Sequence, residues 1–401
     1  VVATFTLLDA EGRVVAVADR LRFARTELGS RAHATGKYQD FEPVALVPRL
    51  AAARPTLAEP EGLLPDGEAA APPELDDVAG AFAWAALRDL GAGDGGNIED
   101  LAAHVPTERL ALLTHVFDLA SQAGAIVFDA EGNWQRGEGE QPDPDALWRQ
   151  RLADRPDALA ELSAIGRIGR GLCELLRGGA WDTVQPSEAV RAHLSTAGPA
   201  FGPATEALCE AVVAAAANAP ADRAIQVVEL HAAGAPLVNR LRARLDPERV
   251  AILFASRDDE ARAHVEADFG PADRVAVAAF DPGRPIAEQD GLSVGEADIV
   301  VGTGIVEGYG DAALQRLAEL LTQDGLLMLA ERRGAGWLAL TDERLLTRWI
   351  EGEERDADGW RDHLFRAGWR QPAAAPVAQG DVVVAQRPAT RAETARLSGS
   401  W

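Results

Sequence analysis

The chain has 401 residues, with 39 Lys and Arg against 63 Asp and Glu, so its formal net charge at pH 7 is −24. Nucleic acids and anionic membranes attract proteins through clustered positive charge, so this balance argues against both as partners. The two cysteines, Cys173 and Cys209, are too few for a disulfide framework and fit a cytoplasmic location, and no apolar run is long enough to predict a membrane-spanning helix.

Residues 1–25 predict a β-hairpin. Two extended runs, ATFTLLDA and GRVVAVADRLRFAR, flank a turn at Asp9–Gly12. A lone hairpin is at best marginally stable in water, so we expect these strands to complete a sheet whose other strands lie upstream. The chain also begins inside a strand-like run without Met, which indicates a fragment of a longer polypeptide. Residues 26–77, rich in Ala, Pro, Gly and acidic residues, predict a linker with little regular structure.

Residues 78–223 predict a helical subdomain. Its first part indicates three helices followed by a small hairpin with a turn at Asp129–Gly132, an arrangement that resembles a winged-helix unit. No basic recognition helix is visible, which argues against DNA binding. Further helices are predicted at 146–177 and 203–218 because apolar residues recur there at three- and four-residue spacing.

Residues 224–387 alternate between strands and helices, which predicts an α/β fold with a doubly wound, mainly parallel sheet. The predicted strands are 225–230, 250–255, 274–279, 298–303, 325–330 and 381–386. The predicted helices between them are 236–245, 258–269, 311–323 and 357–368. Residues 388–401 are polar and predict a linker to a following domain.

The segment AIQVVELHAAGAPLV, residues 224–238, lies where such a fold would hold a cofactor. It predicts a buried strand, a turn and the start of a helix, and nucleotide-like ligands dock against that helix N-terminus. Glycines in the turn would let the backbone approach the ligand, but this turn has few. The segment therefore predicts the framework of a cofactor site with an altered turn.

Six segments resemble the methyltransferase domain of type I polyketide synthases. They are LADRPDALAELSAIGRIGRGLCELLRG (152–178), HLSTAGPAFGPATEALCEAV (193–212), VVELHAAGA (227–235), ADIVVGTGIVEGYGDAAL (297–314), LLTQDGLLMLAE (320–331) and DGWRDHLFRAGW (358–369). The resemblance implies a class I S-adenosylmethionine (SAM) methyltransferase fold with an N-terminal helical lid. It implies C-methylation of a β-ketoacyl chain on acyl carrier protein. It also implies that the hairpin ends a preceding dehydratase (hotdog) domain.

The resemblance assigns the cofactor turn and shows that it departs from the family. The family's acid at the end of the first strand is present as Glu229. The three glycines of the following G-x-G-x-G turn are replaced by His231, Ala233 and Ala235, and Gly234 lies one position away. Each added Cβ crowds a backbone that must approach SAM.

The resemblance also assigns the acids at the other strand ends. The ribose-binding acid is replaced by Ala255, although Asp258 and Asp259 lie nearby. Asp281 matches the acid that faces the adenine, and Asp298 matches the acid that opens the fourth strand.

Methyl transfer needs a base that removes a proton between two carbonyls, and the family uses a His after the fourth strand. In this chain Glu307 occupies that position, within GIVE. A buried carboxylate could act as a base, but we favour drift at a position without chemical demand. A family Tyr near the lid hinge is also replaced, by Ser195.

These four alterations together predict a non-catalytic pseudo-methyltransferase that has no cofactor and acts as a structural domain. Glu229, Gly234 and Asp281 would then be vestigial, and no metal site is expected because His231 has no further ligand at metal spacing. The alternative is an active SAM-dependent C-methyltransferase with Glu307 as its base. The expected partners are the neighbouring dehydratase and downstream domains, and acyl carrier protein, within a homodimeric cytoplasmic synthase.

Overall fold

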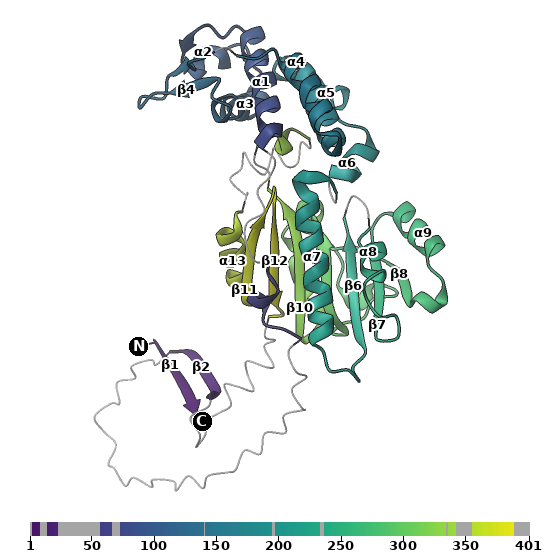
Figure 1. The fold of residues 1–401 in the computed structure, drawn as a ribbon. Coiled ribbons are helices and arrows are strands. Elements are labelled where there is room, and N and C mark those ends of the chain that lie inside the picture. Colours follow the sequence, from purple (N-terminus) through teal and green to yellow (C-terminus); the bar gives the residue numbers. More distant parts are fainter. Residues whose placement is uncertain are drawn as a thin grey trace, which may run out of the picture. The chain divides into compact units, whose positions relative to one another are not determined.

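The structure is a computed structural model that describes residues 2–8, 14–22, 57–65, 73–139, 141–194, 197–232, 236–333, 336–341 and 355–388. The chain divides into a short unit, Val1–Ala53, and a larger one, Arg54–Trp401. In the short unit, β1 (Val2–Leu8) and β2 (Val14–Arg22) pair antiparallel, which confirms the strands of the predicted hairpin (Figure 1). The predicted turn between them lies outside the described residues.

A seven-stranded sheet forms the centre of the larger unit, in the order β11-β12-β10-β9-β6-β7-β8. Its strands are β6 (Ile225–His231), β7 (Val250–Ser256), β8 (Val275–Ala279), β9 (Ala297–Thr303), β10 (Leu321–Arg332), β11 (Arg370–Val377) and β12 (Gly380–Gln386). The strands from β10 to β8 in this order pair in parallel, and β12 runs antiparallel to both of its neighbours. The predicted doubly wound α/β fold is confirmed.

Helices cover both faces of the sheet, and this explains why its strands are continuous apolar runs. On one face, α7 (Gly198–Asn218) packs with α8 (Val238–Arg242) and α9 (Asp259–Asp268) (Figure 1). On the other face, α10 (Ile305–Tyr309), α11 (Ala312–Leu320) and α13 (Ala357–Arg366) pack against the opposite side chains of the same strands. The sheet core is therefore two apolar layers that share one set of strands.

Helix α7 is long and apolar enough to cross a membrane, judged by length and composition alone, which the sequence analysis did not anticipate. Of its apolar window, 61% is buried within the protein. The helix packs along β10 and β12, so its apolar surface belongs to the core of the sheet.

The helical subdomain before the sheet is confirmed and forms the lid. Its helices are α1 (Pro73–Leu90), α2 (Ile98–Ala102), α3 (Leu110–Gln122), α4 (Pro144–Asp154), α5 (Leu159–Leu176) and α6 (Glu188–Leu194). The small hairpin is β4 (Ile126–Phe128) and β5 (Trp134–Arg136), and β3 (Gly95–Gly96) adds a third strand. Short 3-10 helices complete the larger unit at Pro60–Leu63, Thr107–Arg109, Pro156–Ala158, Trp181–Thr183, Pro271–Asp273, Ile286–Glu288 and Gly336–Thr341.

Part of the predicted linker 26–77 is ordered against the sheet. Leu57 and Leu63 are buried in the same core as α7, and the 3-10 helix Pro60–Leu63 contacts the last two strands. Helix α1 also begins at Pro73, five residues before the predicted boundary. Composition concealed these elements because Pro and acidic residues are favourable in the first turn of a helix.

Two elements of the sheet domain, an edge strand and a short helix, were not predicted. Strand β11 has the sequence RQPAAAPV, whose prolines and alanines have low strand propensity, but proline is tolerated because the strand lies at the sheet edge. Helix α10 lies in the glycine-rich GIVEGYG segment and forms because a distant carboxylate binds its first N–H groups. The Glu331 carboxylate accepts from Val306 N at 3.0 Å and from Glu307 N at 3.3 Å.

The segment after β10 ties the lid to the sheet. Its 3-10 helix places Trp337, Leu338 and Leu340 in the apolar cores of the lid helices. The His115 ring of α3 hydrogen-bonds Gly336 O through Nε2 at 2.9 Å. Burial lowers the pKa of His115 to about 4, so its ring is neutral at physiological pH.

A second connection joins α5 of the lid to the start of α7. The Glu161 side chain is fully buried there, and burial raises the pKa of Glu161 to about 7. Gly198 in α7 has a φ of 76°, and a Cβ at this position would collide with the Glu161 carboxylate. The lid is therefore connected to the sheet at two places: through the segment after β10 and through the start of α7.

The central strand provides a direct test of the fold. Val228 in β6 is 3% exposed, and Val228→Asp would bury an unpaired carboxylate at a cost of several kcal/mol, against the ~5–15 kcal/mol that stabilises a typical domain. We expect this variant to lose the cooperative thermal transition measured by circular dichroism. Val294→Asp is the control, because Val294 is 52% exposed and its variant should melt like the wild type. A normal transition in Val228→Asp would contradict this account of the core.

Candidate functional site

The strand order reverses between β6 and β9, because β7 and β8 lie to one side of β6 while β10 lies beyond β9. In open α/β sheets, ligands bind in the crevice outside the carboxyl ends of the strands at such a switch point. The residues that follow β6, β7, β8 and β9 meet at this edge. Among the described residues they include Asp258, Asp281 and Glu307.

Glu229 lies near the carboxyl end of β6, where its side chain is almost fully buried. Its Oε1 accepts a hydrogen bond from Leu237 N at 2.6 Å, so it anchors the far end of the turn. Burial raises the pKa of Glu229 to about 8. Its Oε2 has no hydrogen-bond partner among the described residues. Gly234 and its two neighbours lie outside the part of the chain that the structure describes.

His231, the last residue of β6, packs as a core side chain. Its ring lies 5.3 Å from that of Phe254, and burial lowers the pKa of His231 to about 4. Its carbonyl oxygen accepts from Ser256 Oγ at 3.1 Å and from the Tyr309 hydroxyl at 2.6 Å.

The position that the resemblance assigns to the ribose-binding acid lies near the end of β7 and is apolar. Ala255 is buried in the strand. Asp258 caps α9 by accepting from the backbone N–H groups of the second and third residues that follow it, at 2.9 and 3.3 Å. The Asp259 carboxylate pairs with Arg262. Asp258 and Asp259, the two acids near the position of the ribose-binding acid, are therefore both engaged at the start of α9.

Asp281 follows β8 and remains accessible, with 50% of its side chain exposed. Its Oδ1 accepts from Gly283 N at 2.9 Å and lies 3.8 Å from a guanidinium nitrogen of Arg257. The Arg257 guanidinium in turn lies over the Tyr309 ring, 5.3 Å from its centroid. A carboxylate at this edge is therefore available to a ligand.

Asp298 lies away from this edge, at the amino end of β9. It pairs with Arg223 and accepts from Gln226 N at 3.0 Å. This acid connects two strands and the segment before β6, so its role is structural.

Glu307, at the predicted base position, is held in a buried ion pair. Its side chain is 4% exposed and that of Arg332 is 7% exposed. Arg332 Nε donates to Oε2 at 2.8 Å, and a second guanidinium nitrogen binds Oε1. A bidentate pair of this kind engages both carboxylate oxygens. A general base must present an accessible lone pair to the proton that it removes, whereas both oxygens of Glu307 are engaged by Arg332 and the side chain is buried.

Sequence reasoning missed Glu331 and Arg332, which determine the environment of Glu307. The signal was the pair of charges that ends the apolar run LLMLA, where a strand leaves the core. It also missed Tyr309, one of only two tyrosines in the chain. Ser195, at the lid position of the family Tyr, lies outside the described residues. Among the described residues, no group of three or more His, Cys, Asp or Glu could hold a metal ion.

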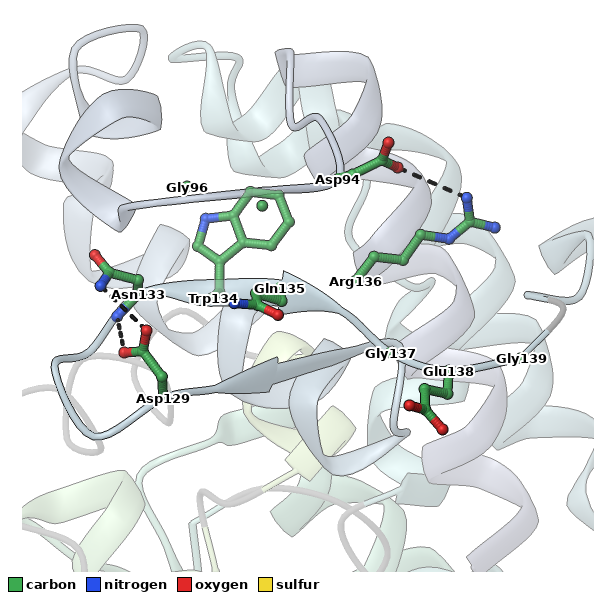
Figure 2. Close-up of a pocket in the computed structure, with 11 residues that line it drawn as sticks. Asp94, Gly96, Asp129, Asn133, Trp134, Gln135, Arg136, Gly137, Glu138 and Gly139 are labelled. Atoms are coloured by element: carbon green, nitrogen blue, oxygen red, sulfur yellow. Dashed lines mark hydrogen bonds and ion pairs between the residues drawn. The ribbon is translucent and has the colours of Figure 1, made fainter.

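The lid carries a shallow depression of about 720 Å³ along β3 and β5 (Figure 2). Three of its four charged side chains have partners nearby. Asp94 lies 3.8 Å from Arg136, and Asp129 accepts from the Asn133 backbone at 2.8 Å. The strand-end crevice is therefore the better candidate for chemistry.

Solved structures similar to this chain are methyltransferases. The CurJ carbon methyltransferase is 16% identical with a TM-score of 0.62, and the match covers 79% of this chain and 92% of that one. The CMeT domain of the citrinin polyketide synthase is 14% identical with a TM-score of 0.60, covering 79% and 90%. The trans-methyltransferase CalH, solved in complex with SAH, is 14% identical with a TM-score of 0.53, covering 79% and 91%. No protein-family model and no curated protein matches the sequence.

These structures correct one expectation. The predicted absence of a cofactor is contradicted, because the neighbours are methyltransferases and CalH was solved with SAH bound. Two features of this chain fit such a ligand: the unpartnered buried Oε2 of Glu229 and the accessible carboxylate of Asp281. The wrong expectation rested on four altered positions and treated Glu229 and Asp281 as vestigial. The chain has the class I methyltransferase fold that these carbon methyltransferases share.

Proposed function

We propose that this chain is a methyltransferase-type domain of a type I polyketide synthase that binds a SAM-class ligand without transferring its methyl group. The sequence motifs and the fold support a carbon-methyltransferase domain. The observation that carries the non-catalytic assignment is the buried ion pair between Glu307 and Arg332.

C-methylation of a β-ketoacyl chain requires removal of a proton from the carbon between two carbonyls. If Glu307 were to release Arg332 and act as the base, it would leave a buried guanidinium without this partner, at a cost of about 3–5 kcal/mol. His231 cannot take the role, because its ring is packed against Phe254 and its lowered pKa makes it a weak base. The ion pair therefore favours the arrangement in which Glu307 stays bound to Arg332 and does not act as a base.

Glu229 and Asp281 are the residues that would hold the ligand. Glu229 anchors the turn next to the helix N-terminus, and Asp281 offers acceptor oxygens after β8. When bound, SAM supplies an electrophilic methyl group on its sulfonium. The competing function is an active C-methyltransferase in which Glu307 serves as the base, and the methylation experiment below separates the two.

A structural role explains which residues have been retained. The sheet core is intact, with Val227, Ile299 and Leu326 fully buried, while the positions assigned to catalysis have changed. A folded domain of this kind would hold the preceding dehydratase and the downstream domain at a fixed separation in a homodimeric synthase. Acyl carrier protein would be a further contact.

A double-mutant cycle tests whether Glu307 is structural. We expect Glu307→Gln and Arg332→Met each to lower the free energy of unfolding by about 3–5 kcal/mol, and the double variant to lose clearly less than the sum. Urea unfolding measures all four proteins. Arg244→Met is the control, because Arg244 and Glu206 form an exposed pair, which typically contributes about 0–1 kcal/mol. Additive losses at Glu307 and Arg332 would count against the pair.

Methyl transfer is tested on a β-ketoacyl acyl carrier protein with SAM, by intact-protein mass spectrometry. We expect the wild type to give no mass increase above a no-protein control, because no described residue at the crevice is positioned as a base. We expect the double variant Glu307→Gln with Arg332→Met to give the same result. Methylation by the wild type that disappears in the double variant would establish Glu307 as a base and overturn the non-catalytic assignment.

The structural role is tested in the intact synthase by measuring product titre together with soluble protein. Val228→Asp should reduce both, because it disrupts the sheet core. Asp281→Ala should leave the titre and the methyl pattern unchanged, since its side chain is exposed and its loss leaves the core intact. Full titre with Val228→Asp, or a lost methyl branch with Asp281→Ala, would contradict the role.

A further inference from the structure

Helix α10 follows β9 at the carboxyl edge of the sheet, beside the switch point. Gly308 packs so closely against the residue after β6 that a Cβ at this position would lie 2.5 Å from Ala232 Cβ. Glycines flank the helix, and Gly304 and Gly310 have φ angles of 59° and 75°, which glycine adopts without strain. The helix is therefore a short element between two glycines whose backbone conformations are unstrained.

Tyr309, the last residue of α10, reaches across the ends of the neighbouring strands. Its hydroxyl donates to His231 O at 2.6 Å and accepts from Arg257 N at 3.4 Å. The edge of its ring meets Phe280 at a centroid distance of 5.4 Å. One side chain that follows β9 thus contacts the residues that end or follow β6, β7 and β8.

The interactions that hold Tyr309 are favourable but replaceable. Burial raises the pKa of Tyr309, so the side chain remains a neutral phenol that donates to the His231 carbonyl. If the phenol withdraws, that carbonyl keeps its hydrogen bond from Ser256 Oγ at 3.1 Å, and no buried acceptor is left unsatisfied. Arg257 is largely exposed and is free to follow the ring or remain with Asp281.

We propose that Tyr309 controls ligand access to this site: its side chain lies in the strand-end crevice, and a SAM-class ligand binds by displacing it. This inference rests on the ligand class of the proposed function and adds the residue that regulates binding there. Tyr309 competes with the ligand for the same position. The ligand affinity therefore decreases as the contacts that hold Tyr309 become stronger.

Affinity for S-adenosylhomocysteine, measured by calorimetric titration of the 401-residue chain, tests the competition. Tyr309→Phe removes the hydroxyl bonds and should bind about fivefold more tightly, the equivalent of one net hydrogen bond. Tyr309→Ala also removes the ring and should bind at least tenfold more tightly. Tyr38→Phe alters the only other tyrosine and should leave the affinity unchanged. Thermal melting of each variant shows that it is folded.

A spectroscopic readout tests the displacement itself. The chain has two tyrosines, so 3-fluorotyrosine labelling gives two ¹⁹F resonances, and Tyr38→Phe leaves only that of Tyr309. We expect this resonance to shift on saturation with S-adenosylhomocysteine. Saturable binding without a shift would overturn the inference, as would equal or weaker binding by Tyr309→Ala.

The outcomes distinguish this inference from the proposed function. If neither the wild type nor the two Tyr309 variants bind S-adenosylhomocysteine at millimolar concentration, the access role and the proposed ligand class both fail. If methyl transfer is detected while the Tyr309 variants still bind more tightly, only the non-catalytic assignment fails.

Discussion

The end of β10 is the point on which the site and the lid both depend. Glu331 binds the first N–H groups of α10, and Arg332 neutralises Glu307 in that helix. A few residues later, the same chain segment places Trp337 in the lid core. Charges buried in a sheet core destabilise a protein unless they are paired and hydrogen-bonded. The cluster of Glu307, Glu331 and Arg332 is therefore stable only when all three residues make their contacts. A change at one member would disturb the position of α10 and the attachment of the lid.

Several residues at or near the positions that the resemblance assigns to the cofactor or the base have structural roles in this chain. Asp258 caps α9, the His231 ring packs against Phe254, and Glu307 forms a buried ion pair. Each role requires only local packing or hydrogen bonding and no substrate. Together they explain how a methyltransferase fold remains stable while its catalytic base position is occupied by an acid with a different partner.

The contacts that hold Tyr309 at the carboxyl edge of the sheet are replaceable interactions. The Tyr309 hydroxyl donates to the His231 carbonyl, which has a second donor, and the Arg257 guanidinium lies over the Tyr309 ring. Each of these interactions contributes modestly to stability. The Glu307–Arg332 pair is different in kind, because both partners are buried. The contacts of Tyr309 and the ion pair of Glu307 are therefore separate interactions at the same edge of the sheet.

Residue patterns alone determined the α/β class, the helical lid and most strands, because a strand covered on both faces must be a continuous apolar run, as in β6 and β9. The family resemblance, rather than the pattern, assigned Glu229, Asp281 and the altered base position. Propensity failed at β11, where an edge position tolerates proline, and at α10, where a carboxylate 24 and 25 residues away supplies the first hydrogen-bond acceptors. Only the tertiary structure could show that Arg332 engages Glu307 and that Tyr309 lies across three strand ends. Parallel strands bring residues distant in sequence to one edge, and the pairing of charges there depends on register and burial, which no local pattern records.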